Sequence, residues 1–302
     1  MLPRIPLPRH TRNIPVHVHG TLLGVQSFIR GEVLRLADRD QRPDAPMQML
    51  LRYSVFLPLF REWQLVRRNS ADAYRAALFA PKRLAHRLDL LRGILLPSLA
   101  GQTLPMQRGL RELVVFTSEE LPSDHRAQLE ATVAPYDWIR LYPLPASTTR
   151  FPPVGPGGPH LSIRLDDDDA ISRNFLSRLS SYFRRGCEGH VITFPVGYLL
   201  RLHAGSPPGF GLIWRPKLST GLTYFVAPGS RFETMTDLTD HNRVDRQAPT
   251  IFGDAAPAWL RSVYDGQDSA DHRRNLSDPR ISLARVQRDF DFDPARLTPP
   301  QS

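Results

Sequence analysis

Hydrophobic positions in the first half of the chain fall into short apolar runs that alternate with helical patterns. The runs have the length of buried strands and end at prolines or polar turns, whereas the segments between them repeat their apolar residues every three or four positions. The predicted strands cover 47–59, 111–122 and 137–145, and the predicted helices cover 81–95 and 124–133, with Pro97 limiting the first helix. Strands that alternate with helices predict an α/β domain with a largely parallel sheet.

A fourth apolar run leads directly into four consecutive aspartates. Leu161, Ile163 and Leu165 alternate with polar residues, as in a strand, and the acid run Asp166–Asp169 begins where this pattern stops. Apolar residues then recur every four positions, which predicts an amphipathic helix, and two later apolar stretches predict further strands. The helix is predicted from Ile171, Phe175, Leu179 and Phe183. The two further strands are predicted at 190–202 and 211–227. The acid run is therefore expected at the carboxyl end of a strand, where open α/β sheets bind ligands.

Four adjacent carboxylates repel one another unless a cation or strong solvation compensates their charge. Two or three of them can converge on Mg²⁺ or Mn²⁺, which prefer oxygen ligands and take further ligands from a diphosphate. Another can accept hydrogen bonds from ribose hydroxyls, and one can cap the following helix. The alternative is a charged surface turn that faces a helix N-terminus and neighbouring arginines. The abrupt change from buried strand to acid run favours the metal and diphosphate interpretation.

The charge of the chain, +9, raises the question of nucleic-acid binding. Of the 39 basic residues only Lys82 and Lys217 are lysine, and the arginines are spread along the whole sequence. A nucleic-acid module normally gathers its basic residues on one element, with aromatic residues between them. Nucleic acid is therefore an unfavoured partner, while attraction to anionic lipids or to a phosphorylated substrate stays open.

No apolar run reaches the length of about 18–20 residues that a membrane span needs, and prolines and charges occupy the first residues in place of a signal peptide. The one cysteine, Cys187, excludes an internal disulfide and fits a reducing compartment. These features favour a cytoplasmic protein, with peripheral membrane association left open. The expected organisation is an N-terminal extension at 1–46, with a short helix near 31–40, one domain at 47–285 and a tail at 286–302.

Several motifs together resemble the bacterial rhamnosyltransferase family, whose members are GT-A-like glycosyltransferases with an Asp-x-Asp motif. These motifs are RYSVF near the first strand, RLDLLRGILLPSLAGQT at 87–103, LVVFTSEELP at 113–122 and RLDDDDAISRNF at 164–175, in this order along the chain. The resemblance covers about Met47 to Arg274. It implies a Rossmann-like mixed sheet flanked by helices and a nucleoside-diphosphate sugar as the donor substrate.

The resemblance also assigns roles to residues of the donor site. Asp166 would contact the nucleoside and share in metal binding, while Asp168 and Asp169 would hold a Mn²⁺ or Mg²⁺ ion that bridges the two phosphates. Ser118 and Glu119, after the second strand, would approach the base or ribose.

The resemblance is weaker in the C-terminal part of the chain. The family pattern leads us to expect a histidine beside Arg261, where this sequence has Val263 and Tyr264. His241 or His272 would then serve as the late metal ligand.

The implied reaction transfers a sugar to a hydroxyl of a glycan or glycoconjugate, as in surface polysaccharide synthesis, with inversion at the anomeric carbon. The metal, with Arg164 or Arg261, would neutralise the departing nucleoside diphosphate. Asp254, between glycine and proline residues, is the preferred base for the acceptor hydroxyl, and Glu233 is the second candidate.

Three other functions are weighed against this one. An aspartyl phosphatase or phosphotransferase needs a spaced pair of acids and a downstream lysine, and only Lys217 follows the acid run. A calcium-dependent or carbohydrate-binding protein spreads its Ca²⁺ ligands over about a dozen residues, unlike this block. A degenerate transferase that binds a sugar nucleotide without turnover remains the alternative, because the expected histidine is missing.

Overall fold

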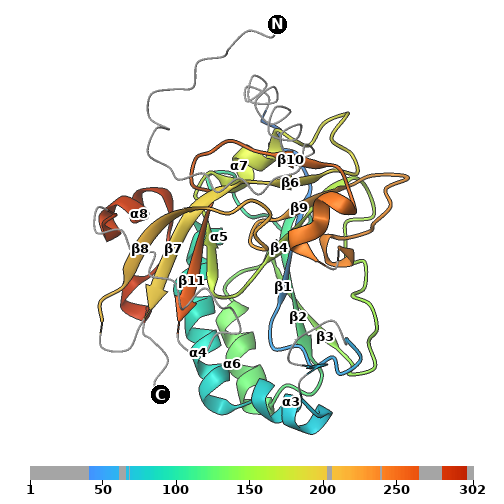
Figure 1. The fold of residues 1–302 in the computed structure, drawn as a ribbon. Coiled ribbons are helices and arrows are strands. Elements are labelled where there is room, and N and C mark those ends of the chain that lie inside the picture. The colour runs from blue at the N-terminus through green and yellow to red at the C-terminus, as the bar shows by residue number, and fades with distance from the viewer. Residues whose placement is uncertain are drawn as a thin grey trace, which may run out of the picture.

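The computed structural model describes residues 41–60, 66–67, 69–202, 206–238, 240–264 and 281–297, and the expected helix near 31–40 lies outside them. Two sheets are present in this described part (Figure 1). The larger has seven strands in the order β10-β6-β9-β4-β1-β2-β3, and the smaller has four in the order β5-β11-β7-β8. Helices lie against the larger sheet, so the predicted α/β class, with a GT-A-like mixed sheet, is confirmed.

The central strands are parallel and follow the predicted apolar runs. They are β1 (Met47–Arg52), β2 (Arg111–Ser118), β3 (Ile139–Leu144) and β4 (His160–Leu165). β1 pairs with β2 on one side and with β4 on the other, all in the parallel sense. The chain thus adds β2 and β3 in one direction and then returns to the other side of β1. This reversal of strand order is the switch point where doubly wound sheets bind ligands.

The remaining strands extend the larger sheet or form the smaller one. β9 (Thr223–Val226) is antiparallel to β4, and β6 (Val191–Thr193) and β10 (Thr250–Phe252) continue from it. The smaller sheet contains β5 (Asp169–Ile171), β7 (Val196–Leu202), β8 (Gly209–Trp214) and β11 (Trp259–Tyr264). β5 begins with the last aspartate of the acid run, so the run connects the two sheets.

Alternation along the central strands sorts their side chains onto two faces. Met49, Leu51 and Ile163 belong to the main core, which also contains apolar residues of the helices α4 (Pro81–Leu90), α5 (Leu96–Ala100), α6 (Ser123–Val133) and α7 (Phe175–Ser180). Figure 1 shows α4 and α6 side by side beside this part of the sheet. Leu50 faces the other way, in a smaller cluster with Val114 and Phe116. On that face, the amide of Met235 in the short helix η3 (Met235–Asp237) donates to Ser162 Oγ at 2.9 Å.

The sequence predicted that the helix beginning at Pro81 would end before Pro97, but the structure shows that it continues. It continues through a π-helical turn, η2 (Leu91–Leu95), into α5 and ends at Ala100. Proline at 97 cannot donate to the carbonyl of Gly93, and the wider turn makes room for its ring. The Gly93 carbonyl instead accepts the amide of Asp293 at 2.7 Å, so a distant segment supplies the missing hydrogen bond.

The segment at 281–297 packs on the smaller sheet, and it contains the described part, 286–297, of the tail predicted at 286–302. It contains α8 (Leu283–Asp289) and η6 (Pro294–Arg296). Val286, Phe290 and Leu297 are buried in one core with Tyr198 of β7 and Leu260 of β11. The other short helices described are α3 (Ala71–Leu78) and η4 (His241–Arg246). In the described ranges, no helix combines the length and apolar character required to cross a bilayer.

Other predicted elements also differ from the structure. The stretch predicted as a strand at 190–202 forms β6 and β7, and the one at 211–227 covers β9 and most of β8. The strand predicted at 47–59 ends at Arg52, and the helix predicted from 171 begins only at Phe175. Asp169–Ile171 forms β5 instead, because it pairs with Trp259–Arg261 of β11, which is distant in sequence. Tertiary pairing here overrides the local helical pattern.

Candidate active site

The candidate site lies where β1, β2 and β4 end. Their parallel pairing puts Arg52, Ser118 and the acid run Asp166–Asp169 at the same edge of the sheet, next to the switch point between β1 and β4. Ser118 is fully buried and accepts the amide of Glu120 at 3.1 Å, while Glu119 is exposed at this edge. The predicted nucleoside-facing turn therefore lies at the same sheet edge as the acid run, with the end of β1 between them.

Burial alternates along the four aspartates. Asp167 and Asp169 are only 4% and 3% exposed, whereas Asp166 and Asp168 are intermediate. The two buried carboxylates anchor the run to the protein, and the two intermediate ones lie nearer the surface. One short motif thus contains two different kinds of acid.

Asp167 is held by a two-pronged ion pair with Arg87 of α4. Arg87 Nε and Nη2 donate to the two carboxylate oxygens at 2.6 and 2.7 Å. The Arg87 side chain also donates to the carbonyl of Arg52 and the hydroxyl of Ser54, just after β1. Burial opposes the charge of Arg87, but the contact with Asp167 outweighs it and raises the pKa of the guanidinium.

Asp169 is anchored by groups from two other segments. The amide of Ser262 in β11 donates to Oδ1 at 3.1 Å, and the hydroxyl of Thr220 is hydrogen-bonded to Oδ2. Burial and the neighbouring charges of Asp168 and Asp166 raise the pKa of Asp169 well above its ordinary value. Both oxygens of this carboxylate therefore have partners within the protein.

Asp166 has the opposite environment. Its Oδ2 accepts the hydroxyl of Ser219 at 2.9 Å, and its Oδ1 lies 3.8 Å from Nη2 of Arg164. Burial opposes ionisation, but the charges of Arg164, Arg52 and Arg261 lower the pKa of Asp166 to about 2. This carboxylate is therefore ionised at neutral pH and surrounded by guanidinium groups.

The arginines around Asp166 repel one another. Leu50 and Arg164 are register partners, and Arg52 follows Leu50 by two positions, so Arg52 and Arg164 project from the same face of adjacent strands. Burial, together with the charge of Arg164, lowers the pKa of Arg52 to about 9. Among the described residues, the buried Nε of Arg164 has no hydrogen-bond partner. Such a cluster is suited to binding an anion.

The predicted histidines have different outcomes. His241 of η4 is near enough to Arg164 and Asp166 for their charges to act on its imidazole, and burial, followed by the charge of Arg164, lowers its pKa to about 4. His272 lies outside the described residues. Near Asp168 the structure places Tyr264, whose pKa is raised by burial and then by the charges of Asp168 and Asp167. The Tyr264 ring packs edge-on against His86 of α4, with centroids 4.8 Å apart.

The two candidate bases both pair with arginines. Arg178 of α7 donates to the Asp254 carboxylate from Nη2 at 2.7 Å and from Nε at 3.1 Å. Asp254 follows β10, whose carboxyl end is at the same sheet edge as that of β4, three strand spacings or about 14 Å away.

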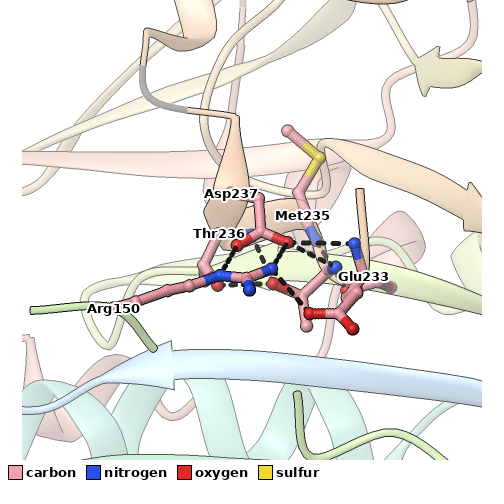
Figure 2. A network of polar contacts seen from close by, with 7 residues as sticks. Arg150, Glu233, Met235, Thr236 and Asp237 are labelled. Atoms are coloured by element: carbon pink, nitrogen blue, oxygen red, sulfur yellow. Dashed lines mark hydrogen bonds and ion pairs between the residues drawn. The ribbon is translucent and has the colours of Figure 1, made fainter. Parts of the chain in front are cut away.

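Glu233 belongs to an exposed network beside η3 (Figure 2). Arg150 donates to Glu233 at 2.6 Å and to Asp237 at 3.0 Å, so this glutamate ties the proline-rich loop before β4 to η3. Neither Glu233 nor Asp254 has a hydrogen bond to the acid run among the contacts described for these residues.

Comparison with known proteins decides the family. Residues 47–276 match the sequence family described as "Putative rhamnosyl transferase", and this match covers most of the chain. The chain belongs to this family. No curated protein matches it. Membership confirms the resemblance seen in the motifs and makes the chain a glycosyltransferase, and the rhamnosyl transferase match includes every strand of both sheets.

The acids of this glycosyltransferase would suit a metal ion that takes the rest of its coordination shell from the substrate. No group of three His, Cys, Asp or Glu side chains suited to holding a metal occurs in the part of the chain that the structure describes. Mg²⁺ commonly takes one or two carboxylates and completes its shell with phosphate oxygens and waters. Asp168 and Asp166 fit this description, because they are the less buried acids of the run.

Sequence reasoning missed Arg87, Arg52 and the hydroxyls of Ser219 and Thr220. Arg87 lies within a helical pattern in which the leucines carried the signal. Ser219 and Thr220 come from a loop more than 50 residues after the acid run. Only the motif RLDLLRG, in which Arg87 is the first residue, could have drawn attention to one of them.

Proposed function

We propose that the chain is a metal-dependent, inverting glycosyltransferase that moves a sugar from a nucleoside-diphosphate sugar to a hydroxyl of a glycan or glycoconjugate. One observation carries this proposal. Ionised Asp166 and half-buried Asp168 lie at the switch point of the sheet, beside arginines whose positive charges repel one another. The family description supports rhamnose as the transferred sugar.

The acids and the arginines have complementary tasks in this proposal. Asp168 and Asp166 would hold a Mn²⁺ or Mg²⁺ ion, which supplies positive charge to the phosphates when it is bound. Arg164, Arg52 and Arg261 stabilise the negative charge that develops on the nucleoside diphosphate as the sugar leaves. Glu119, which is exposed just after β2, would contact the nucleoside, with the buried Ser118 beside it at the end of the strand.

A base must accept the proton of the acceptor hydroxyl as that oxygen attacks the anomeric carbon. Asp254 is the candidate at the correct sheet edge, whereas Glu233 is exposed beside η3. Direct displacement by the acceptor inverts the anomeric centre, so a β-linked rhamnosyl donor gives an α-linked product.

Asp254→Asn separates a catalytic role from a structural one. Asparagine cannot accept the proton, so kcat is expected to fall about 100-fold or more if Asp254 is the base. It also weakens the pair with Arg178, which costs about 2–4 kcal/mol of unfolding free energy for a largely buried pair. Arg178→Gln breaks the same pair and serves as the control. If kcat falls equally in the two variants, after correction for unfolded protein, Asp254 is not the catalytic base.

We further place the reaction in the cytoplasm, with membrane-peripheral association when the acceptor is lipid-linked. The single cysteine, Cys187, is buried, and burial raises the pKa of its thiol, as expected for an unreactive cysteine in a reducing compartment. The excess of arginine gives the chain a positive charge that would favour an anionic membrane surface.

The direct test is a panel of thymidine, uridine and guanosine diphospho-sugars, with Mn²⁺ or Mg²⁺ and with EDTA. We expect metal-dependent release of nucleoside diphosphate from one donor, measured by a coupled assay or by chromatography, and an increase when an acceptor glycan is added. Binding of a donor without turnover would instead favour a degenerate transferase. Absence of both binding and turnover with every donor would refute the proposal.

A further inference from the structure

The strongest feature outside the reacting groups is the contact between Arg87 and Asp167. Both side chains are largely buried, with 14% and 6% of their side-chain surfaces exposed. The two parallel hydrogen bonds, at 2.6 and 2.7 Å, fix the carboxylate in position and in orientation. Each carboxylate oxygen of Asp167 thus already accepts a charged hydrogen bond from Arg87, and the carboxylate is largely shielded from solvent.

Arg87 also joins the acid run to the end of β1. One guanidinium contacts the carbonyl of Arg52 at 3.1 Å and the Ser54 hydroxyl at 3.3 Å, while its carbon lies 5.2 Å from the ring centre of Tyr53. Ser54 has a positive φ of 48°, which is unfavourable for a residue with a side chain. The strained turn after β1 is thus held by the same group that holds Asp167.

A second contact connects Tyr53, at the end of β1, to helix α6. The Tyr53 hydroxyl is hydrogen-bonded to Nε2 of His125 in α6 at 2.7 Å, and the two rings are nearly parallel. The contacts run from α6 through Tyr53 and Arg87 to Asp167 without interruption. Three elements that meet at the sheet edge therefore set the position of the middle of the acid run.

We propose that Arg87 is a positioning residue for the donor site, which acts through Asp167 on the two neighbouring acids. Asp166 and Asp168 flank Asp167, so the peptide groups that Arg87 immobilises through Asp167 also set the directions of their side chains. This inference rests on the proposed function, in which those two carboxylates serve the metal and the donor. Groups that orient metal-binding side chains typically change affinity or activity by about 10–100-fold when removed.

The test compares Arg87→Gln, Arg87→Lys and Asp167→Asn with Arg92→Gln. Arg92 lies on the same continuous helix and donates twice to Thr132 of α6, at 2.9 and 2.7 Å, so its replacement also removes a fixed arginine contact. Hydrogen exchange of the peptide that spans 164–170 reports the order of the acid run without any substrate. Thermal unfolding and the steady-state constants kcat and KM, measured at several Mn²⁺ concentrations, complete the comparison.

We expect Arg87→Gln and Asp167→Asn to accelerate exchange in this peptide about 10-fold or more, and Arg92→Gln to leave it unchanged. In Arg87→Gln and Asp167→Asn, turnover should fall about 10–100-fold and the Mn²⁺ concentration required should rise. Arg87→Lys should retain more turnover than Arg87→Gln, because lysine keeps the positive charge but cannot form the two parallel hydrogen bonds to Asp167. If Arg87→Gln does not fold, Asp167→Asn and Arg87→Lys carry the comparison.

Unchanged exchange in all three variants overturns the inference, and so does unchanged turnover despite faster exchange. A wild-type protein that turns over no donor refutes the proposed function. In that case exchange alone decides whether Arg87 fixes the acid run, since it needs neither metal nor sugar nucleotide.

Discussion

Replacing Asp168 with asparagine is expected to lower the release of nucleoside diphosphate at least about 100-fold while the protein stays folded. The substitution keeps the size of the side chain and removes the negative charge that would hold the metal beside the diphosphate. Asp168 is the less buried neighbour of two anchored acids, so its loss leaves the anchors in place. Turnover with saturating Mn²⁺ and the melting temperature are the two measurements.

Asp169→Asn and Asp137→Asn are the matched comparisons for this prediction. Asp137 is an exposed acid at the opposite edge of the sheet, before β3, and its replacement should change neither quantity. In Asp169→Asn, the amide can still accept from Ser262 and can donate to Thr220, so its loss of turnover should be the smaller one. A larger loss with Asp169→Asn than with Asp168→Asn would return the metal-binding role to Asp169.

The sequence predicted those parts of the fold that depend on local pattern. β1 and β2 are short and mainly apolar, whereas apolar residues alternate with polar ones in β3 and β4. The parallel arrangement of β1, β2 and β3 follows from the helices between them. The place of the acid run at the sheet edge follows from the same rule, because it comes directly after β4. These features need no knowledge of distant contacts.

The parts that the sequence did not predict depend on pairings between distant segments. β5 was not predicted, and its last residue, Ile171, was assigned to a helix, because the pairing with β11 joins residues about ninety positions apart. The passage of the helix through Pro97 depends on Asp293, which supplies the hydrogen bond that Gly93 lacks. Local propensity carries no information on either contact.

The same division applies to the site. The acids were identified because they are consecutive, but the difference between anchored and exposed acids comes from Arg87, Ser262 and Thr220. Arginine is so frequent in this chain that no single one stands out by composition. Only the fold shows that Arg52 and Arg164 lie on one face of adjacent strands.

These two arginines lead to the second large effect. Arg52 and Arg164 are mostly buried and close enough to repel, and Arg164 Nε lacks a hydrogen-bond partner within the part of the chain that the structure describes. Asp166 compensates only part of this positive charge. A diphosphate carries at least two negative charges, so its binding would relieve the repulsion and supply acceptors for the unused donor.

Arg164→Gln is therefore expected to weaken binding of a nucleoside diphosphate about 10–100-fold, with little change in the melting temperature. Relief of repulsion with Arg52 offsets the lost contact with Asp166, so stability should change less than affinity does. Calorimetric titration with the nucleoside diphosphate and with the corresponding monophosphate isolates the second phosphate, and the monophosphate should be affected less. Arg140→Gln removes the same charge from an exposed position on β3 and should leave both affinities unchanged. Equal weakening for the two nucleotides would mean that Arg164 contacts the nucleoside or the first phosphate, and unchanged affinity for both would exclude the arginine cluster from the donor site.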